Sequence, residues 1–392
     1  MSTLQEAYQI CLKKFDKHMD CIDKVHLYEY TGSKDGNYEN GKMGQTLANF
    51  WNWMTSFVTG MAPLFYRTEK KAEYLAWANG FEKAYHDKMF ETPLEAMHDI
   101  GFLYSPYSVA MYQLTGDRKH RADALQAADV LLKRFNINGK YISAWDRMDE
   151  EEEEHWMIID CMMNIQLLFW AWQESGHNMY KDVAKAHMDT TIKYFVREDY
   201  SVCHAFKMDP KTGEVLHENN SCGYANGSHW ARGTAWMVYG LAYAAGHLQD
   251  AYYSELAEKI LAKYLEGLYE GSYVPVWDFR LPADMPAFQC GRKDNPDWDV
   301  ADPANCVYNV DTSAAAIIAC AMIQLDRFSG EKKYQKAVED TLTELCEQYF
   351  NEDPDTLGMI HHQNGGMWYT TYGDYYFAQA LQQYLFDTES CW

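Results

Sequence analysis

Two kinds of segment alternate along the chain: one is apolar on nearly all sides, and the next keeps its apolar residues on one face. Residues 99–117 and 119–135 form such a pair, and residues 160–176 and 180–195 form another. Apolar positions spaced three and four residues apart are typical of α-helices. The pattern therefore predicts helical hairpins, each made of a buried helix and a surface helix, that recur every ~60–70 residues.

Three further pairs have the same layout, and each buried helix ends at a short turn. They cover residues 52–68 and 71–89, 232–246 and 251–265, and 311–330 and 333–350. Glycine at such a turn, as at Gly116, Gly176 and Gly330, is the residue expected to end a helix. With a first helix at 3–24 and a last one at 372–386, the chain has about twelve helices.

The buried helices decide how the hairpins assemble. They start near residues 44, 98, 156, 230, 308 and 372. Helices this apolar could not line the water-exposed concave face of an open solenoid, so we expect a closed ring of six inner and six outer helices. The predicted fold is all-α, in a single domain over residues 1–392. Strands are not evident beyond short pieces such as Tyr273–Trp277.

The two ends of the predicted ring differ in the length of their connections. Turns from an inner to an outer helix are short, whereas the returning connections are long: 136–155, 198–230, 267–307 and 351–371. Long loops gathered at one end of a rigid scaffold commonly carry the functional residues. The inner helices start at this end, and charged residues lie at their starts: Asp99, Asp160, Arg232, Asp311 and Asp374.

Composition narrows the classes of partner and location. A formal charge of −23 argues against nucleic acid or an anionic membrane as the partner. The 13 Trp and 30 Tyr suit a sugar-binding cleft, although helical proteins also use such rings for packing. No apolar run is long enough to span a bilayer, and no secretory leader pattern is recognisable. The ten cysteines are scattered, so we expect a reducing, cytoplasmic location.

One aspartate stands among apolar residues. Asp160 is the only charged residue in 156–172, a stretch predicted to be helical, and burial there should raise its pKa. Asp99 holds the equivalent place in the preceding hairpin, and packed helices lie ~8–10 Å apart, so the two carboxyls should face one pocket. Two acids, at least one of them protonated, are what acid/base chemistry at a glycosidic bond requires. The alternative is that both aspartates only cap their helices.

Arg232 and Trp236 lie one turn apart at the start of another inner helix. The guanidinium could hold a carboxylate through two hydrogen bonds, and the indole could stack on a sugar ring. Alternatively, Arg232 forms a structural ion pair with Asp99 or Asp160.

Trp53 and Phe57, on the first inner helix, and Trp145, in a loop, are further candidate platforms for a sugar. Any one of them alone is more often part of a core. The histidines near this end, His98, His155, His204, His229, His361 and His362, match no metal-binding motif. No phosphate loop or dinucleotide fingerprint is present, so we expect no metal and no cofactor. The acidic stretch 294–303 lacks the pattern of a calcium loop and is interpreted as solvated.

Several motifs together resemble the unsaturated glucuronyl hydrolases of glycoside hydrolase family 88. Each is weak alone, but the set is specific and covers most of the chain. The motifs are Asn52–Phe57, His98–Phe102, Asp160 in its apolar segment, Trp230–Trp236, Val274–Phe279, Asp311–Ala315 and Gly373–Phe377.

The resemblance implies a fold, a substrate and residue roles. This family has an (α/α)6 barrel and removes the 4,5-unsaturated uronic acid that lyases leave at the non-reducing end of oligosaccharides, including glycosaminoglycan disaccharides. By resemblance, Asp160 is the general acid/base, which protonates C4 of the enol ether and then activates water to attack C5. Asp99 is the second essential acid. The implied substrate contacts are His98, Trp145, His204, Arg232 and Trp236, with Trp53 and Phe57 near the leaving sugar.

The chain departs from the family pattern at Cys222. Family members commonly carry Gln-Gly-Tyr where this chain has Cys222–Tyr224, and that glutamine contacts the sugar. A thiol cannot replace both the donor and the acceptor of an amide, so we expect the contact near C2 and C3 to differ. Three other functions stay open: inverting hydrolysis of a saturated glycoside, unsaturated rhamnogalacturonyl hydrolysis, and binding without catalysis by a helical-repeat scaffold.

Overall fold

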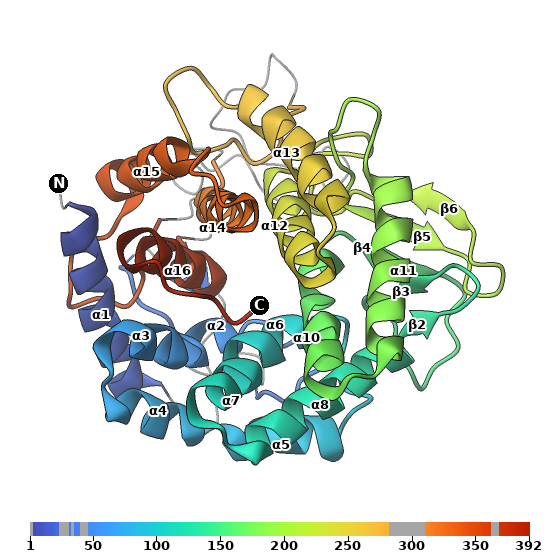
Figure 1. Cartoon of the computed structure of the whole chain (residues 1–392), viewed down its shortest axis with the longest axis horizontal. Helices are drawn as coiled ribbons and strands as arrows, with labels where there is room; N and C mark the ends of the chain where they lie inside the picture. Colours follow the sequence, from blue (N-terminus) through green and yellow to red (C-terminus); the bar gives the residue numbers. More distant parts are fainter. Residues whose placement is uncertain (1–2, 23–30, 33–34, 40–45, 282–309, 362–367) are drawn as a thin grey trace.

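The helices form two concentric layers around a common centre (Figure 1). The computed structural model describes residues 3–22, 31–32, 35–39, 46–281, 310–361 and 368–392. The inner layer contains α2 (Ser56–Thr59) with α3 (Met61–Glu69), α6 (Ile100–Tyr104) with the π-helix η1 (Ser105–Val109) and α7 (Ala110–Thr115), α9 (Cys161–Asn164) with α10 (Gln166–Ser175), α12 (Ala231–Leu248), α14 (Thr312–Ser329) and α16 (Thr371–Phe386). Each inner segment contacts the next, and α16 contacts α2, so the ring closes. The predicted all-α barrel is confirmed.

The outer layer covers this ring with amphipathic helices. It contains α1 (Leu4–Cys21), α4 (Ala72–Asn79) with α5 (Glu82–Phe90), α8 (Arg118–Lys133), α11 (Asn178–Phe195), α13 (Ala251–Glu266) and α15 (Gln335–Glu344) with the π-helix η2 (Leu345–Tyr349). Gly116, Gly176 and Gly330 have positive φ at the ends of inner helices, as predicted. Among the described helices, none is both long enough and apolar enough to cross a membrane.

The inner helices approach one another closely where small residues face them. A Cβ added to Gly101 of α6 would lie 2.3 Å from the Asn164 Cα of α9. A Cβ added to Gly240 of α12 would lie 2.5 Å from the carbonyl oxygen of Met162. These glycines therefore set the helix separation near the starts of α6 and α9.

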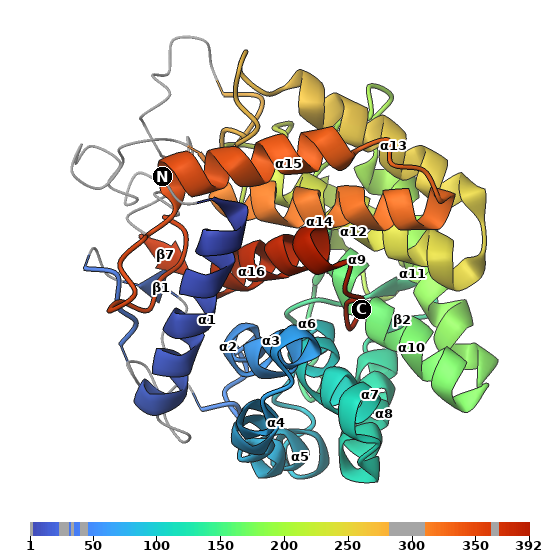
Figure 2. The same ribbon diagram turned by 60° about the vertical axis from the view of Figure 1, so that its left-hand side comes forward.

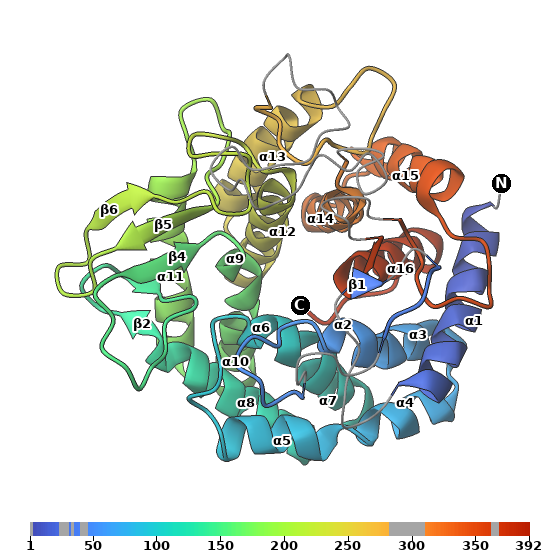
Figure 3. The ribbon, with the colours of Figure 1, turned by 180° about the vertical axis from the view of Figure 1, so that it is seen from behind.

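A small antiparallel sheet replaces part of a predicted helix. Residues 156–158 belong to strand β4 (His155–Ile158), and the helix begins only at Cys161. Strand β4 pairs with β5 (Ala205–Met208), which pairs with β6 (Val215–Glu218). These strands come from two of the long connections and cover one side of the ring (Figure 3). The segment Tyr273–Trp277 is not a strand and makes only an isolated bridge between Val276 and Val310.

The other strand pairs and bridges are short. Strand β1 (Thr31–Gly32) pairs with β7 (Tyr369–Thr370), and β2 (Phe135–Asn136) pairs with β3 (Tyr141–Ile142). The bridge between Trp230 and Asp278 joins the start of α12 to the connection that follows α13. The β1–β7 pair and the Trp230–Asp278 bridge thus fix the chain just before α16 and α12.

The first inner helix begins later than predicted. Trp53 lies in the loop before α2, because Asn52 Oδ1 accepts hydrogen bonds from the backbone and hydroxyl of Thr55 at 3.3 and 2.8 Å. This local turn delays the helix until Ser56. Trp53 is therefore a loop residue, whereas Phe57 lies on α2 as expected.

The C-terminal tail turns back into the centre of the ring (Figures 1 and 2). Trp392 is buried, and its ring stacks on Tyr376 with centroids 6.3 Å apart. Phe102, at the start of α6, lies 5.9 Å from the same indole and 5.0 Å from Trp236. The tail thus packs beneath the residues at the starts of the inner helices.

We expect Gly101→Ala to lower the free energy of unfolding by about 1–3 kcal/mol, because the added methyl group overlaps the backbone of α9. Gly246→Ala in α12 is the matched control, since a Cβ there meets nothing closer than 3.8 Å. Its improved helix propensity should stabilise the chain by up to about 1 kcal/mol. Denaturant unfolding measures both. Equal effects would contradict the close approach of α6 and α9.

Candidate active site

Asp99 and Asp160 occupy the N-cap positions of α6 and α9, but neither side chain forms a capping hydrogen bond. The capping alternative is therefore wrong for both. Instead, Asn164 connects them: its Nδ2 donates to Asp99 Oδ1 at 2.9 Å and to the Asp160 carbonyl oxygen at 3.3 Å. Its Oδ1 accepts from the Phe102 backbone at 2.8 Å. The two carboxyls are thus placed together by a helix-to-helix contact.

The two carboxyls differ in their surroundings. The Asp160 side chain is 19% exposed and the Asp99 side chain 8%, so Asp160 is the more accessible acid. Burial raises the pKa of Asp160 to about 6, while the positive charge of Arg232 opposes this rise. Burial, and next the negative charge of Asp160, raise the pKa of Asp99 to about 8. Near neutral pH the deeper acid therefore holds its proton more firmly.

His204 faces Asp160 with a defined tautomer. The Cys222 backbone N–H donates to His204 Nδ1 at 3.2 Å, so the neutral imidazole carries its proton on Nε2. That Nε2 lies 3.9 Å from Asp160 Oδ2, beyond hydrogen-bond distance. His98 is buried beside the other acid, with Nε2 3.4 Å from Asp99 Oδ1. Each aspartate thus has one histidine neighbour.

Arg232 forms its ion pair with Asp311, so the alternative of a pair with Asp99 or Asp160 is wrong. Arg232 Nη1 donates to Asp311 Oδ2 at 2.5 Å. Asp311 Oδ1 accepts from the Ala314 backbone at 3.0 Å and thereby caps α14. Burial lowers the pKa of Arg232, but Asp311 together with smaller contributions from Tyr372, Cys222 and Asp160 outweighs it, so the net pKa is raised and the guanidinium stays charged.

Aromatic rings enclose the guanidinium. Its carbon lies 4.7 Å from the centroid of Trp230 and 5.2 Å from that of Tyr372. Tyr372 in turn stacks on Trp53, with centroids 5.4 Å apart. The chain of contacts runs from Trp53 to Arg232, so these predicted site residues lie on one side of the site.

Trp236 and Cys222 lie close to the acids. The indole N–H of Trp236 is directed toward Asp160 and lowers its pKa, although the two groups form no hydrogen bond of good geometry. The Cys222 carbonyl oxygen accepts from Trp277 Nε1 at 3.0 Å. Because its N–H is bound to His204, both backbone groups of Cys222 are fixed.

Not all predicted residues meet at the acids. Phe57 is fully buried among the rings of Phe102, Tyr375 and Tyr376, which makes it a core residue. Trp145 packs on Trp156, with centroids 5.2 Å apart, and lines a groove of about 490 Å³ beside the sheet. That groove is formed by the loop before β4.

Three residues with clear contacts were not singled out as site residues. Asn164 lies one helical turn after Asp160, and this spacing in the sequence could have identified it as a neighbour of the acids. Asp311 and Tyr372 lie at the starts of inner helices. Their positions in the sequence predicted the end of the ring at which they lie, but not their contacts with Arg232. Asp374 is bound by the Tyr38 hydroxyl at 2.9 Å and the Ile360 backbone at 3.0 Å, a structural arrangement. The acidic stretch 294–303 lies outside the described residues.

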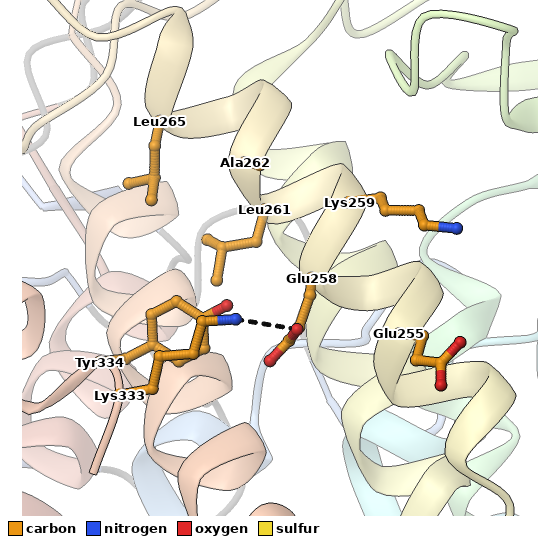
Figure 4. Close-up of a pocket in the computed structure, with 8 residues that line it drawn as sticks. All are labelled: Glu255, Glu258, Lys259, Leu261, Ala262, Leu265, Lys333 and Tyr334. Atoms are coloured by element: carbon orange, nitrogen blue, oxygen red, sulfur yellow. Dashed lines mark ion pairs between the residues drawn. The ribbon is translucent and has the colours of Figure 1, made fainter. Parts of the chain in front are cut away.

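A second hollow lies on the outer layer (Figure 4). It has a volume of about 580 Å³ and is lined by residues of α13 together with Lys333 and Tyr334. Leu261 and Leu265 face Tyr334, and Lys333 forms an ion pair with Glu258 at 2.9 Å. This hollow contains no pair of buried acids, and its Lys333 is paired with the partly exposed Glu258, so it is the weaker candidate.

Comparison with known proteins identifies the family. The model described as Glycosyl Hydrolase Family 88 matches residues 22–270. The chain belongs to this family. It is therefore a glycoside hydrolase, and the resemblance seen in its motifs is confirmed.

Named relatives and solved structures are similar to this chain over most of their length. An unsaturated chondroitin disaccharide hydrolase of Streptococcus pyogenes serotype M1 is 28% identical over 99% of this chain and 93% of its own. An unsaturated glucuronyl hydrolase of Bacillus sp. (strain GL1) is 30% identical over 89% of this chain and 90% of its own. The crystal structure of an unsaturated glucuronyl hydrolase of Streptococcus agalactiae has a TM-score of 0.83 at 27% identity, covering 99% of this chain and 93% of that one.

We expect Asp99→Asn to gain stability relative to the native hydrolase as the pH rises from about 5 to 9. Both native carboxyls bind protons more tightly in the folded state, because burial raises their pKa values. Their contribution to the free energy of unfolding is complete below the pKa that an aspartate has in the unfolded chain. It is lost as the pH rises through about 6 for Asp160 and about 8 for Asp99. The amide of the variant has no proton to lose.

The free energy of unfolding of both proteins, measured across this pH range, checks the expectation. Other titrating groups act alike in both proteins, so the difference isolates the acid pair. A difference that stays constant with pH would show that Asp99 is not a buried, protonated acid.

Proposed function

We propose that this hydrolase releases the 4,5-unsaturated uronic acid from the non-reducing end of lyase-generated oligosaccharides, with glycosaminoglycan disaccharides as a substrate class. The observation that carries the proposal is a buried Asp160 with a pKa raised to about 6, placed beside Asp99, His204 and Arg232. The related hydrolases named for unsaturated chondroitin disaccharides and glucuronyl substrates support the substrate class.

Asp160 is the general acid/base of this proposal. The unsaturated sugar is an enol ether, whose C4 accepts a proton from the neutral carboxyl while positive charge develops at C5. The resulting Asp160 carboxylate then takes a proton from a water molecule while the oxygen of that water attacks C5. The hemiketal so formed opens, and the leaving sugar departs without attack at the anomeric carbon. The raised pKa keeps enough carboxyl protonated near pH 6 for the first step.

Arg232 binds the carboxylate of the uronic acid. The Asp311 ion pair holds its guanidinium in place and keeps it charged, against the net charge of −23. Asp99, protonated near neutral pH, donates a hydrogen bond to the sugar or to the Asp160 carboxylate. The remaining proposed sugar contacts are His98, Trp145, His204, Cys222, Trp236 and Trp53, with Phe57 supporting the last of these from the core.

We also propose a cytoplasmic location. Six of the described cysteines are buried and have free thiols, which suits a reducing compartment. In an oxidising compartment, by contrast, disulfide bonds form and persist.

Asp160→Asn is expected to lower kcat by about 10²–10⁴-fold with little change in KM, because the amide cannot donate and recover a proton. Turnover is followed by the loss of ultraviolet absorbance of the conjugated double bond on unsaturated disaccharides. Native kcat/KM should fall as the pH rises through about 6, where Asp160 loses its proton.

Asp374→Asn is the matched control, since Asp374 is a buried acid near the start of another inner helix and keeps its Ile360 contact through the amide oxygen. We expect it to retain turnover. Near-native kcat in Asp160→Asn would contradict its role. If the enzyme instead formed product from saturated glycosides, with no change in ultraviolet absorbance during turnover, ordinary inverting hydrolysis would be favoured.

Cys222→Gln should lower KM for unsaturated disaccharides by roughly 5–10-fold, the equivalent of one added hydrogen bond. The backbone of Cys222 is held by His204 and Trp277, so a longer side chain extends toward Arg232. Cys222→Ala is the control and should leave KM within about twofold, because it removes the thiol without adding an amide. Equal KM values in both variants would show that this position does not contact the sugar.

A further inference from the structure

A second cluster of ionisable residues lies in the outer layer, on α5 and α8. Glu82 and His86 are one turn apart on α5, and Asp123 faces them from α8. One potential ligand atom from each residue lies within 4.8 Å of the others. His86 Nδ1 and Asp123 Oδ1 are 2.9 Å apart. These helices pack side by side on the outside of the ring (Figure 1), and neither carries an acid of the active site.

The buried carboxylate of Asp123 is only partly satisfied. Asp123 is 0% exposed, whereas the His86 side chain that contacts it is 47% exposed. Among the described residues, no group forms a hydrogen bond with Asp123 Oδ2, which is also buried. A buried carboxylate oxygen without a partner costs free energy unless a proton or a cation satisfies it. The burial of Asp123 accordingly raises its pKa.

The neighbouring His120 shows the same deficit. It lies one turn before Asp123 on α8 and is fully buried. Its Nε2 is 3.2 Å from Asn79 Oδ1, but its Nδ1 has no hydrogen-bond partner in the described part of the chain. The charge of Glu82 acts on this imidazole. Two buried polar atoms of α8 are therefore unsatisfied among the described residues: Asp123 Oδ2 in the cluster, and His120 Nδ1 beside it, where the imidazole faces Asn79 of α4.

The three-residue geometry suits a transition-metal ion. With metal–ligand bonds of ~2.0–2.2 Å, neighbouring ligands around a metal lie ~3.0–3.5 Å apart. The observed separations, 2.9 Å between His86 Nδ1 and Asp123 Oδ1 and no more than 4.8 Å for the other pairs, need only side-chain adjustment to reach this range. One imidazole with two carboxylates is a ligand set that suits Zn²⁺ better than Ca²⁺ or Mg²⁺, which prefer more oxygen ligands.

We propose that Glu82, His86 and Asp123 bind Zn²⁺ and thereby cross-link α5 to α8. The ion contacts Asp123 and replaces the direct hydrogen bond between His86 and Asp123. Because the folded chain alone brings the two helices together, binding stabilises the folded state. The site lies outside the inner ring, so its ion takes no part in the hydrolysis.

Zn²⁺ titration of the metal-free full chain by calorimetry, together with thermal unfolding, tests the proposal. We expect stoichiometric binding and a higher Tm with Zn²⁺. His86→Gln and Glu82→Gln, both at partly exposed positions, should weaken binding by more than about tenfold. His217→Gln is the matched control, because His217 is an exposed histidine on β6, far along the chain from the cluster. It should bind as the native chain does.

Co²⁺ provides a second readout that does not depend on stability. The visible absorption of bound Co²⁺ should show nitrogen and oxygen ligands in the native chain and disappear in His86→Gln. The proposal would be overturned if Zn²⁺ binding were weak and unchanged by His86→Gln. It would also be overturned if His217→Gln reduced binding as much as His86→Gln does. Hydrolytic activity should be the same with and without Zn²⁺, which separates this site from the function of the acid pair.

Discussion

The close contact between α6 and α9 is the constraint on which the site depends. Gly101 has no side chain because the backbone of Asn164 occupies that space. The same Asn164 then reaches Asp99 and the Asp160 carbonyl oxygen with its side chain. Close packing reduces the exposure of both carboxyls to water, and this desolvation raises their pKa values. A bulkier residue at position 101 would disturb the packing and the acid pair together.

Arg232 is the cation that acts on Asp160 in a strongly acidic chain. Arg232 lowers the pKa of Asp160, and Asp311 holds the guanidinium from the next inner helix. Asp311 also caps α14, so the same carboxylate orders a helix and positions the arginine. Trp230 and Tyr372 restrict the guanidinium further. The positive charge is therefore supplied locally, where an anionic sugar would need it.

Errors in the sequence predictions have identifiable physical causes. The apolar segment from Trp156 looked helical throughout, but its first residues pair with β5, a partner 47–51 residues away that periodicity does not reveal. Trp53 was placed on a helix, whereas the local turn at Asn52 delays that helix. Phe57 carries the correct motif but is enclosed by rings from α6 and α16. The capping interpretation failed because neither aspartate side chain accepts a hydrogen bond from the first turn of its own helix.

The sequence by itself determined the ring of alternating helices, its glycine turns and the end at which the inner helices start. These follow from local periodicity and from residues a few positions apart. Tertiary structure alone decided which charges meet: Asn164 binds an aspartate 65 residues away, and Arg232 binds one 79 residues away. Desolvation of a carboxyl depends on everything packed around it, so neither its pKa nor its partner can be obtained from spacing along the chain.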